Sequence, residues 1–280
     1  MGIGEVGESL RRSTVHIHTM GPRQQSAGSG VIWDSEGTII TNAHVLGKGA
    51  YHVELWDGRS FRAEVKAKDD QRDLGKLKLP ATGLPAVTRR NSPVRAGELV
   101  IAVGNPLGFT GALTTGIVHA AGSFLGLGRR PWVQAAIRLA PGNSGGPLAD
   151  AAGHVIGINT MIVHGGIALA VPIAAVEEFV QNGAGPRLGV TIQPVRWRRD
   201  GIGLLILSVD PGSPAGKASL LMGDLLVGTA QNRFTGTADL FDAIREAGLG
   251  RLKLRFLRGD RLHEREVVIS LDNRFTQEAA

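Results

Sequence analysis

The sequence contains no cysteine. That absence excludes disulfide bonds, thiol nucleophiles and zinc sites built from cysteine thiolates. No run of the sequence approaches the roughly 18 consecutive apolar residues that a membrane-spanning helix needs. The first residues also lack an apolar core of signal-peptide length. From these absences we predict no membrane span and a cytoplasmic location.

Aromatic residues make up only 5% of the 280 residues, whereas 40 are glycine. Many short segments with glycine at the turns favour β structure over long helices. The formal net charge is +6, but the arginine pairs at 11–12, 89–90, 129–130 and 198–199 are scattered along the chain. Because no basic run is interleaved with aromatic residues, we expect no nucleic-acid partner. His16 and His18 share a strand face without a third ligand, and we expect no metal and no cofactor.

Hydrophobic periodicity divides the chain into two parts, as its length also suggests. The first part consists of short β segments, expected at 13–19, 30–33, 38–41, 51–56, 60–66, 74–79, 98–103, 112–120, 154–163 and 167–171. So many strands at this spacing favour barrels or a sandwich. A terminal helix at 172–181 and a linker at 182–187 follow, after which strands alternate with two helices. We predict a mainly β domain at 1–183 and an α+β domain at 184–275.

The segment PGNSGGPL at 141–148 carries the first chemical signal. Glycines on both sides of Ser144 allow backbone conformations that are closed to other residues, and they leave the hydroxyl unobstructed. Acyl transfer needs N–H donors directed at the developing oxyanion. We expect the loop formed by Gly142, Asn143 and Ser144 to be the oxyanion hole, with the N–H groups of Gly142 and Ser144 as its donors.

The same segment matches G-x-S-x-G, but that pattern belongs to a hydrolase elbow only between a strand and a helix, with the histidine after the serine. Here a β-like run follows, HVIGINT at 154–160. Upstream, His44 follows the apolar strand at 38–41, and Asp73 directly precedes the strand at 74–79. The order His44, Asp73, Ser144 is that of the chymotrypsin class. Asp69 or Asp70 remains an alternative acid.

Several segments together resemble the HtrA (Deg) family of PDZ serine proteases. They are GSGVIWD at 28–34, TNAHV at 41–45, DLGKLKL at 73–79, AVGNPLG at 102–108, TTGIV at 114–118, RLAPGNSGGPL at 138–148, PRLGV at 186–190 and SVDPGSPAGKASL at 208–220. The resemblance implies a chymotrypsin-like double six-stranded β-barrel followed by a C-terminal PDZ domain. It also implies a serine endopeptidase that cleaves unfolded or damaged proteins.

The resemblance further implies where substrates and peptides bind. The primary specificity pocket is expected from Ile167, Ala168, Leu169 and Ala170. A carboxylate-binding loop for C-terminal peptides is expected from Arg187, Leu188, Gly189 and Val190, because successive N–H groups can bind a carboxylate and the adjacent strand can pair with a peptide. The helix residues Leu240, Phe241 and Ile244 are expected to wall the peptide groove.

The chain departs from the family pattern in three respects. Ala135–Ala136–Ile137 stands where the family often has Thr-Asp-Ala, Lys76 replaces a usually apolar residue, and Gly75 replaces a usual alanine. A PDZ scaffold or holdase chaperone with weak proteolysis is therefore the alternative function. Members of the family commonly form trimers through N-terminal aromatic residues, and residues 1–30 contain none, so a homotrimer remains open. Most members also work in the bacterial envelope, in contrast to the location expected above.

Overall fold

The computed structural model describes residues 2–20, 27–47, 49–106, 111–124, 130–163, 166–197, 201–259 and 263–271. The chain divides into two compact units, Met1–Gly183 and Ala184–Ala280. Residues 272–275 of the domain predicted at 184–275 lie outside the described residues. Of the helices that these ranges contain, none combines the length and the apolar character that a membrane crossing requires.

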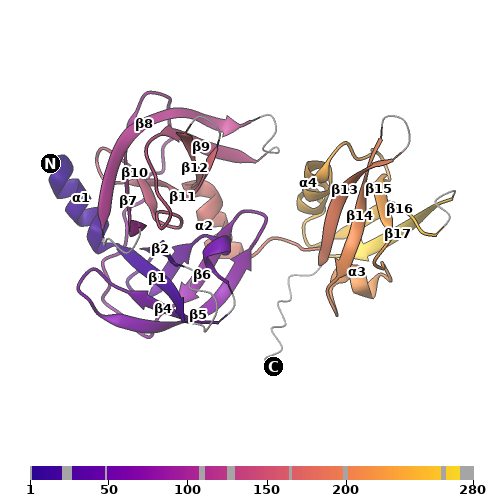
Figure 1. Ribbon diagram of the computed structural model, residues 1–280, viewed down its shortest axis with the longest axis horizontal. Coiled ribbons are helices and arrows are strands. Elements are labelled where there is room, and N and C mark those ends of the chain that lie inside the picture. Colours follow the sequence, from indigo (N-terminus) through magenta and orange to yellow (C-terminus); the bar gives the residue numbers. More distant parts are fainter. Residues whose placement is uncertain are drawn as a thin grey trace. The chain divides into compact units, whose positions relative to one another are not determined.

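The first six strands close into a barrel in the order β1-β2-β3-β6-β5-β4 (Figure 1). They are β1 (Thr14–Met20), β2 (Ala27–Ile32), β3 (Thr38–Thr41), β4 (Ala50–Glu54), β5 (Ser60–Asp69) and β6 (Leu74–Lys78). Inward-facing side chains such as Ile17, Ile39 and Leu77 alternate with outward ones and are fully buried. Period-two alternation therefore fills this barrel with aliphatic side chains.

The next six strands close into a second barrel in the order β10-β11-β12-β9-β8-β7. They are β7 (Leu99–Gly104), β8 (Ala112–Ser123), β9 (Pro131–Ala136), β10 (Pro147–Asp150), β11 (Val155–Val163) and β12 (Ile167–Pro172). The helix α2 (Ile173–Asn182) ends this unit. The two six-stranded barrels confirm that part of the predicted fold class.

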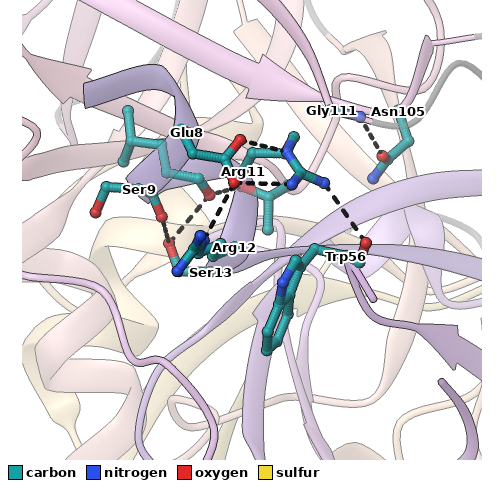
Figure 2. Close-up of polar contacts among 10 residues, drawn as sticks. Glu8, Ser9, Arg11, Arg12, Ser13, Trp56, Asn105 and Gly111 are labelled. Atoms are coloured by element: carbon teal, nitrogen blue, oxygen red, sulfur yellow. Dashed lines mark hydrogen bonds and ion pairs between the residues drawn. The ribbon is translucent and has the colours of Figure 1, made fainter. Parts of the chain in front are cut away.

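An N-terminal helix, α1 (Ile3–Arg12), contacts both barrels. The Arg11 guanidinium bonds Glu8 on the same helix and donates to the Trp56 carbonyl oxygen of the first barrel at 3.5 Å (Figure 2). Its side chain also covers Gly111, before the second strand of the other barrel, where a Cβ would collide with it. The helix therefore contacts the first barrel through β1 and Trp56 and the second through β7 and Gly111.

The second unit contains a five-stranded antiparallel sheet in the order β13-β14-β15-β16-β17. Its elements are β13 (Val190–Trp197), β14 (Gly201–Val209), α3 (Pro214–Lys217), β15 (Leu225–Thr229), α4 (Thr237–Ala247), β16 (Arg251–Leu257) and β17 (Glu264–Ser270). A core that includes Leu188, Leu204, Leu240 and Leu254 joins the sheet to its helices. β13 is an edge strand, paired only with β14 among the described strands.

Three elements differ from the sequence expectations. The helix α1 and the strands β9 and β10 are present where the sequence predicted none. β10 has only four residues and is almost wholly buried, so it shows no alternation. The first residues of α1 include Gly4 and Gly7, which disfavour a helix. Burial of Val6 and Leu10 stabilises this helix instead.

Candidate active site

His44 and Asp73 meet at the ends of two neighbouring strands. His44 lies in the short 3-10 turn Ala43–Val45 after β3, and Asp73 directly precedes β6. The His44 Nδ1 lies 2.9 Å from Asp73 Oδ2 and 3.0 Å from Oδ1, and the His44 backbone N–H donates to Oδ1 at 3.0 Å. A carboxylate only accepts, so Nδ1 carries the proton and Nε2 is left as the basic nitrogen.

Asp73 is held in an uncommon backbone conformation. Its φ of 56° lies in the left-handed region, where among the described residues the only other non-glycine is Ser219. The Asn42 side chain donates to the Asp73 carbonyl oxygen at 2.9 Å and supports this turn. Asp69, the alternative acid, instead accepts the N–H groups of Gln71 and Arg72. The structure therefore brings Asp73, and not Asp69, to His44.

Thr160 on β11 is the third residue at this carboxylate, and sequence reasoning did not single it out. Its hydroxyl donates to Asp73 Oδ2. Burial raises the pKa of the Asp73 carboxyl, but the hydrogen bonds from the His44 ring, the Thr160 hydroxyl and the His44 N–H outweigh it and hold that pKa below its usual value. Asp73 is therefore ionised near neutral pH.

Ser144 lies in the loop before β10, close to the same threonine. Its hydroxyl donates to the Thr160 carbonyl oxygen at 3.0 Å, and so not to the His44 ring. The glycines on either side are needed for this loop: Gly142 has a φ of 105°, and a Cβ on Gly145 would collide with the Ser29 carbonyl oxygen. A strand follows the loop and no helix does, which excludes the hydrolase elbow.

The next feature is the set of backbone N–H groups in the loop 142–144 that was expected to bind the oxyanion. In the described part of the chain, neither the Gly142 N–H nor the Ser144 N–H donates to another residue. Asn143, the middle residue of this loop, directs its N–H and its side-chain amide to the Ala140 carbonyl oxygen, at 3.0 and 3.1 Å. Asn143 therefore shapes the turn and is not a free donor.

Ser29 of the first barrel also holds this loop, although sequence reasoning gave it no role. Its N–H donates to the Ser144 carbonyl oxygen at 2.8 Å, and its hydroxyl donates to the Gly142 carbonyl oxygen at 2.7 Å. The Ser29 hydroxyl also accepts a hydrogen bond from the Asn105 N–H at 2.9 Å, so the proton of that hydroxyl points to the Gly142 carbonyl oxygen. Ser29 thus holds the carbonyl groups of Gly142 and Ser144 in this loop.

The residues expected to line the specificity pocket lie on β12. Ala168 and Ala170 belong to the apolar cluster inside the second barrel, and Leu169 is fully buried. Ile167 is partly exposed. None of the four carries a charge, and their role in specificity stays a prediction.

The predicted peptide groove maps onto the second unit. In Arg187–Val190, Gly189 has a φ of 73°, and its Cβ position is blocked by Ser213. Within the described residues, the N–H groups of Leu188 and Gly189 donate to no other group. Leu240 and Ile244 are buried in the core rather than exposed, whereas Phe241 is 41% exposed. Of the three helix residues, Phe241 alone offers a substantial exposed surface.

Two of the residues that depart from the family pattern, Lys76 and Ala136, have different surroundings. The Lys76 ammonium donates to the Val180 carbonyl oxygen in the last turn of α2, at 3.3 Å. Ala136 is exposed at the end of β9. Across the residues that the structure describes, no group of three or more His, Asp or Glu side chains is placed to hold a metal ion.

Comparison with known proteins gives one family match and many relatives. The trypsin-like peptidase domain matches residues 28–158. The chain is 35% identical to the putative serine protease HhoA of Synechocystis sp., a match that covers 84% of this chain and 68% of that protein. It is 33% identical to serine protease HTRA1 of Xenopus tropicalis, covering 88% and 62%. Four curated relatives are matched over 48–68% of their own length.

A solved structure supports the same relationship. The serine endoprotease of Yersinia pestis aligns over 97% of both chains with a TM-score of 0.67 and 26% identity. The likeness therefore extends over both units and is not restricted to the region around Ser144.

Proposed function

Because the chain belongs to the HtrA family of trypsin-like serine proteases, we propose that it is a serine endopeptidase whose catalytic triad is His44, Asp73 and Ser144. The observation that carries the proposal is the bonded group of His44, Asp73 and Thr160, with the Ser144 hydroxyl on the same threonine. The orientation of the imidazole by a buried carboxylate is the arrangement that serine acyl transfer requires.

Catalysis begins when the Ser144 hydroxyl leaves the Thr160 carbonyl oxygen and turns toward His44. Apo hydrogen bonds of this kind commonly form only when substrate binds. The oxygen attacks the peptide carbonyl carbon while its proton passes to His44 Nε2. The N–H groups of Gly142 and Ser144 stabilise the oxyanion, each contributing about 2.7–4 kcal/mol.

The tetrahedral intermediate then breaks its carbon–nitrogen bond, and His44 returns the proton to the leaving amine. Water enters, gives a proton to His44, and attacks the ester on Ser144. The acid product leaves as Ser144 regains that proton. Asp73 stays ionised throughout and stabilises the imidazolium. Its lowered pKa suits this role.

The substrate is an extended polypeptide, as unfolded proteins supply. Residues 161–163 of β11 pair with β12 on one side, whereas β10 pairs only with residues earlier on β11. Within the described residues the other edge at 160–163 is therefore open to an incoming strand. The uncharged residues 167–170 favour cleavage after small or medium aliphatic side chains, because a buried charge would lack a partner.

The second unit acts as a PDZ domain that binds C-terminal peptides. The unbonded N–H groups of Leu188 and Gly189 and the edge strand β13 support this assignment. A peptide carboxylate accepts those N–H groups, and its backbone extends the sheet. A homotrimeric assembly stays a prediction, which mass by light scattering tests.

The test compares casein cleavage by the wild type, Ser144→Ala, His44→Ala and the double variant. Triad members act as a unit, so each single change should lower kcat by about 10⁴–10⁶-fold, and the double variant should be scarcely worse. Ser13→Ala is the matched control, because it removes a buried hydroxyl bonded only to helix carbonyls. It should retain activity.

Two outcomes would contradict the proposal. Wild-type cleavage that persists in Ser144→Ala would show that another residue is the nucleophile. No cleavage by the wild type, across pH and with added C-terminal peptides, would favour the scaffold or holdase.

A further inference from the structure

Asn105, directly after β7, is a buried residue whose hydrogen bonds join both barrels. Its side-chain nitrogen donates to the Val15 carbonyl oxygen on β1 at 2.9 Å, and its side-chain oxygen accepts the Gly111 N–H at 2.9 Å (Figure 2). These two partners fix which end of the amide is the donor. The Asn105 N–H and the side-chain nitrogen also both donate to the Ser29 hydroxyl oxygen, at 2.9 and 3.2 Å.

These two donors decide where the Ser29 hydroxyl points. A hydroxyl has two acceptor lone pairs and one proton. Because Asn105 donates to both lone pairs, the proton is directed to the remaining contact, the Gly142 carbonyl oxygen at 2.7 Å. Ser29 is fully buried, so its protein neighbours and not bulk solvent determine this direction. Asn105 thus sets the polarity of a hydrogen bond that it does not itself make.

The bond from Ser29 completes the restraint on the peptide unit between Gly142 and Asn143. The carbonyl of that unit accepts the Ser29 proton, and its N–H donates to the Ala140 carbonyl oxygen at 3.0 Å. Gly142 needs such a restraint, because a glycine with a φ of 105° has many accessible conformations. It also packs directly on Asn105, whose carbonyl oxygen would collide with a Cβ on Gly142.

We propose that Asn105 and Ser29 are positioning residues of the oxyanion hole: Asn105 directs the Ser29 proton to the Gly142 carbonyl oxygen, and that bond keeps the Gly142 N–H aligned with the developing oxyanion. The inference rests on the proposed endopeptidase function and adds to it a control of transition-state stabilisation from outside the triad. Oxyanion donors are effective because they are aligned before charge develops. Both residues act through Gly142, so their loss should lower kcat and leave KM unchanged.

The main variant is Ser29→Ala, which removes the proton donor and leaves the Gly142 carbonyl free to turn. On a quenched peptide with valine before the cut, we expect kcat to fall about 10- to 100-fold, somewhat less than the loss of a whole oxyanion donor. KM should stay within about two-fold. A peptidyl boronic acid of matching sequence forms a tetrahedral adduct with Ser144 that resembles the transition state, and its affinity should fall in parallel with kcat/KM.

Asn105→Asp tests the direction of the proton. A carboxylate only accepts, so it should draw the Ser29 proton away from Gly142 and lower kcat as much as Ser29→Ala does, although the serine is intact. The double variant should be scarcely worse, because the two residues act on one bond. Asn105→Ala keeps the backbone donor to Ser29 and should lower kcat only about 2- to 10-fold. It provides the test if the buried aspartate prevents folding.

Ser13→Ala is the matched control. It is the same substitution at another buried serine, whose hydroxyl donates to carbonyl oxygens of α1. Its melting temperature should fall to an extent comparable with that of Ser29→Ala, whereas kcat and the affinity for the boronic acid should not change.

Three results would overturn the positioning role. They are an unchanged kcat in folded Ser29→Ala, a loss of kcat without a loss of affinity for the boronic acid, and an equal loss of kcat in Ser13→Ala. The second would place the effect at proton transfer to His44 and not at the oxyanion. Failure of the endopeptidase function is distinct, because the wild type would then neither cleave the peptide nor bind the boronic acid through Ser144.

Discussion

Asp73 accepts hydrogen bonds from three directions, two from His44 and one from Thr160. Each bond favours the ionised carboxylate, and together they outweigh the burial of the group. Thr160 belongs to the second barrel, and the other two groups belong to the first. The protonation state of Asp73 therefore depends on both barrels, and a single threonine hydroxyl is the contribution of the second barrel.

The first prediction concerns that hydroxyl. Thr160→Val removes the bond to Asp73 and keeps the side-chain shape, so the pKa of Asp73 should rise. A carboxyl with a lowered folded-state pKa stabilises the protein above its unfolded pKa, and that stability is lost as pH falls through the folded pKa. In the variant the loss should occur at higher pH, and kcat should fall by about 10-fold or more. Melting temperature from pH 7 to 3 and kcat at pH 7.5 test both.

Thr14→Val is the matched control, because Thr14 is also buried and donates to a helix carbonyl, that of Leu10, at 2.7 Å. It should destabilise the protein to a similar extent without changing kcat or the acid limb. The role given to Thr160 would be wrong if the two valine variants behaved alike.

The three residues of the proposed triad were singled out from the sequence because each has a local signature. His44 and Asp73 lie at strand ends, and glycines flank Ser144. Thr160 and Ser29 have no such signature. Thr160 bonds Asp73 across 87 residues, and Ser29 bonds Gly142 across 113. A threonine or serine in a β segment is common, so only the packed barrels show which hydroxyl reaches the site.

At the scale of the element, the strands that the sequence predicted differ from those it missed in whether they alternate apolar and polar residues. Half-buried strands such as β4 and β5 alternate along the chain and could be predicted. β10 is buried on both faces, and the glycines of α1 conceal its apolar face. β10 therefore lacks periodicity, whereas Ile3, Val6 and Leu10 of α1 do recur at helical spacing, and the glycines of that helix are what counted against it. β10 directly follows the loop that contains Ser144, and α1 contacts both barrels.

Lys76 provides the prediction at this scale. Its ammonium bonds a carbonyl in the last turn of α2, where the helix dipole favours a cation. Lys76→Met should therefore lower the free energy of unfolding by about 0.3–1 kcal/mol. Casein cleavage should be unchanged, because Lys76 contacts no residue of the triad. Urea unfolding and kcat/KM measure the two effects.

The control is Lys66→Met, which removes an ammonium from β5 whose partner is the exposed Glu64. Exposed pairs contribute little, so its effect should be smaller. A gain of proteolysis in Lys76→Met at unchanged stability would instead show that this departure from the family pattern weakens the enzyme.

At the scale of the whole molecule, the chain consists of two units with separate cores. The clusters around Leu204 and Leu225 contain only residues of the second unit. The barrel clusters contain only residues of the first. Separate cores permit separate folding. The proposed division of labour, with cleavage in one unit and peptide recognition in the other, can therefore be tested on the second unit by itself.

We expect residues 184–275 alone to unfold cooperatively and to bind peptides that end in an apolar residue with a free carboxylate. Calorimetry should give a micromolar Kd, about −8 kcal/mol. Amidation of the peptide should weaken binding at least about 10-fold, since the N–H groups of Leu188 and Gly189 would lose a charged acceptor.

Two glycine variants distinguish an effect on the Arg187–Val190 loop from a general loss of stability. Gly189→Ala should abolish binding, because a Cβ there collides with Ser213 and the loop must shift. Gly212→Ala also meets a positive φ, 69°, but in open space. It should lose about 1 kcal/mol of stability, the cost of a left-handed alanine, and still bind. Equal affinity for the acid and the amide, or undiminished binding by Gly189→Ala, would show that Arg187–Val190 does not recognise a carboxylate.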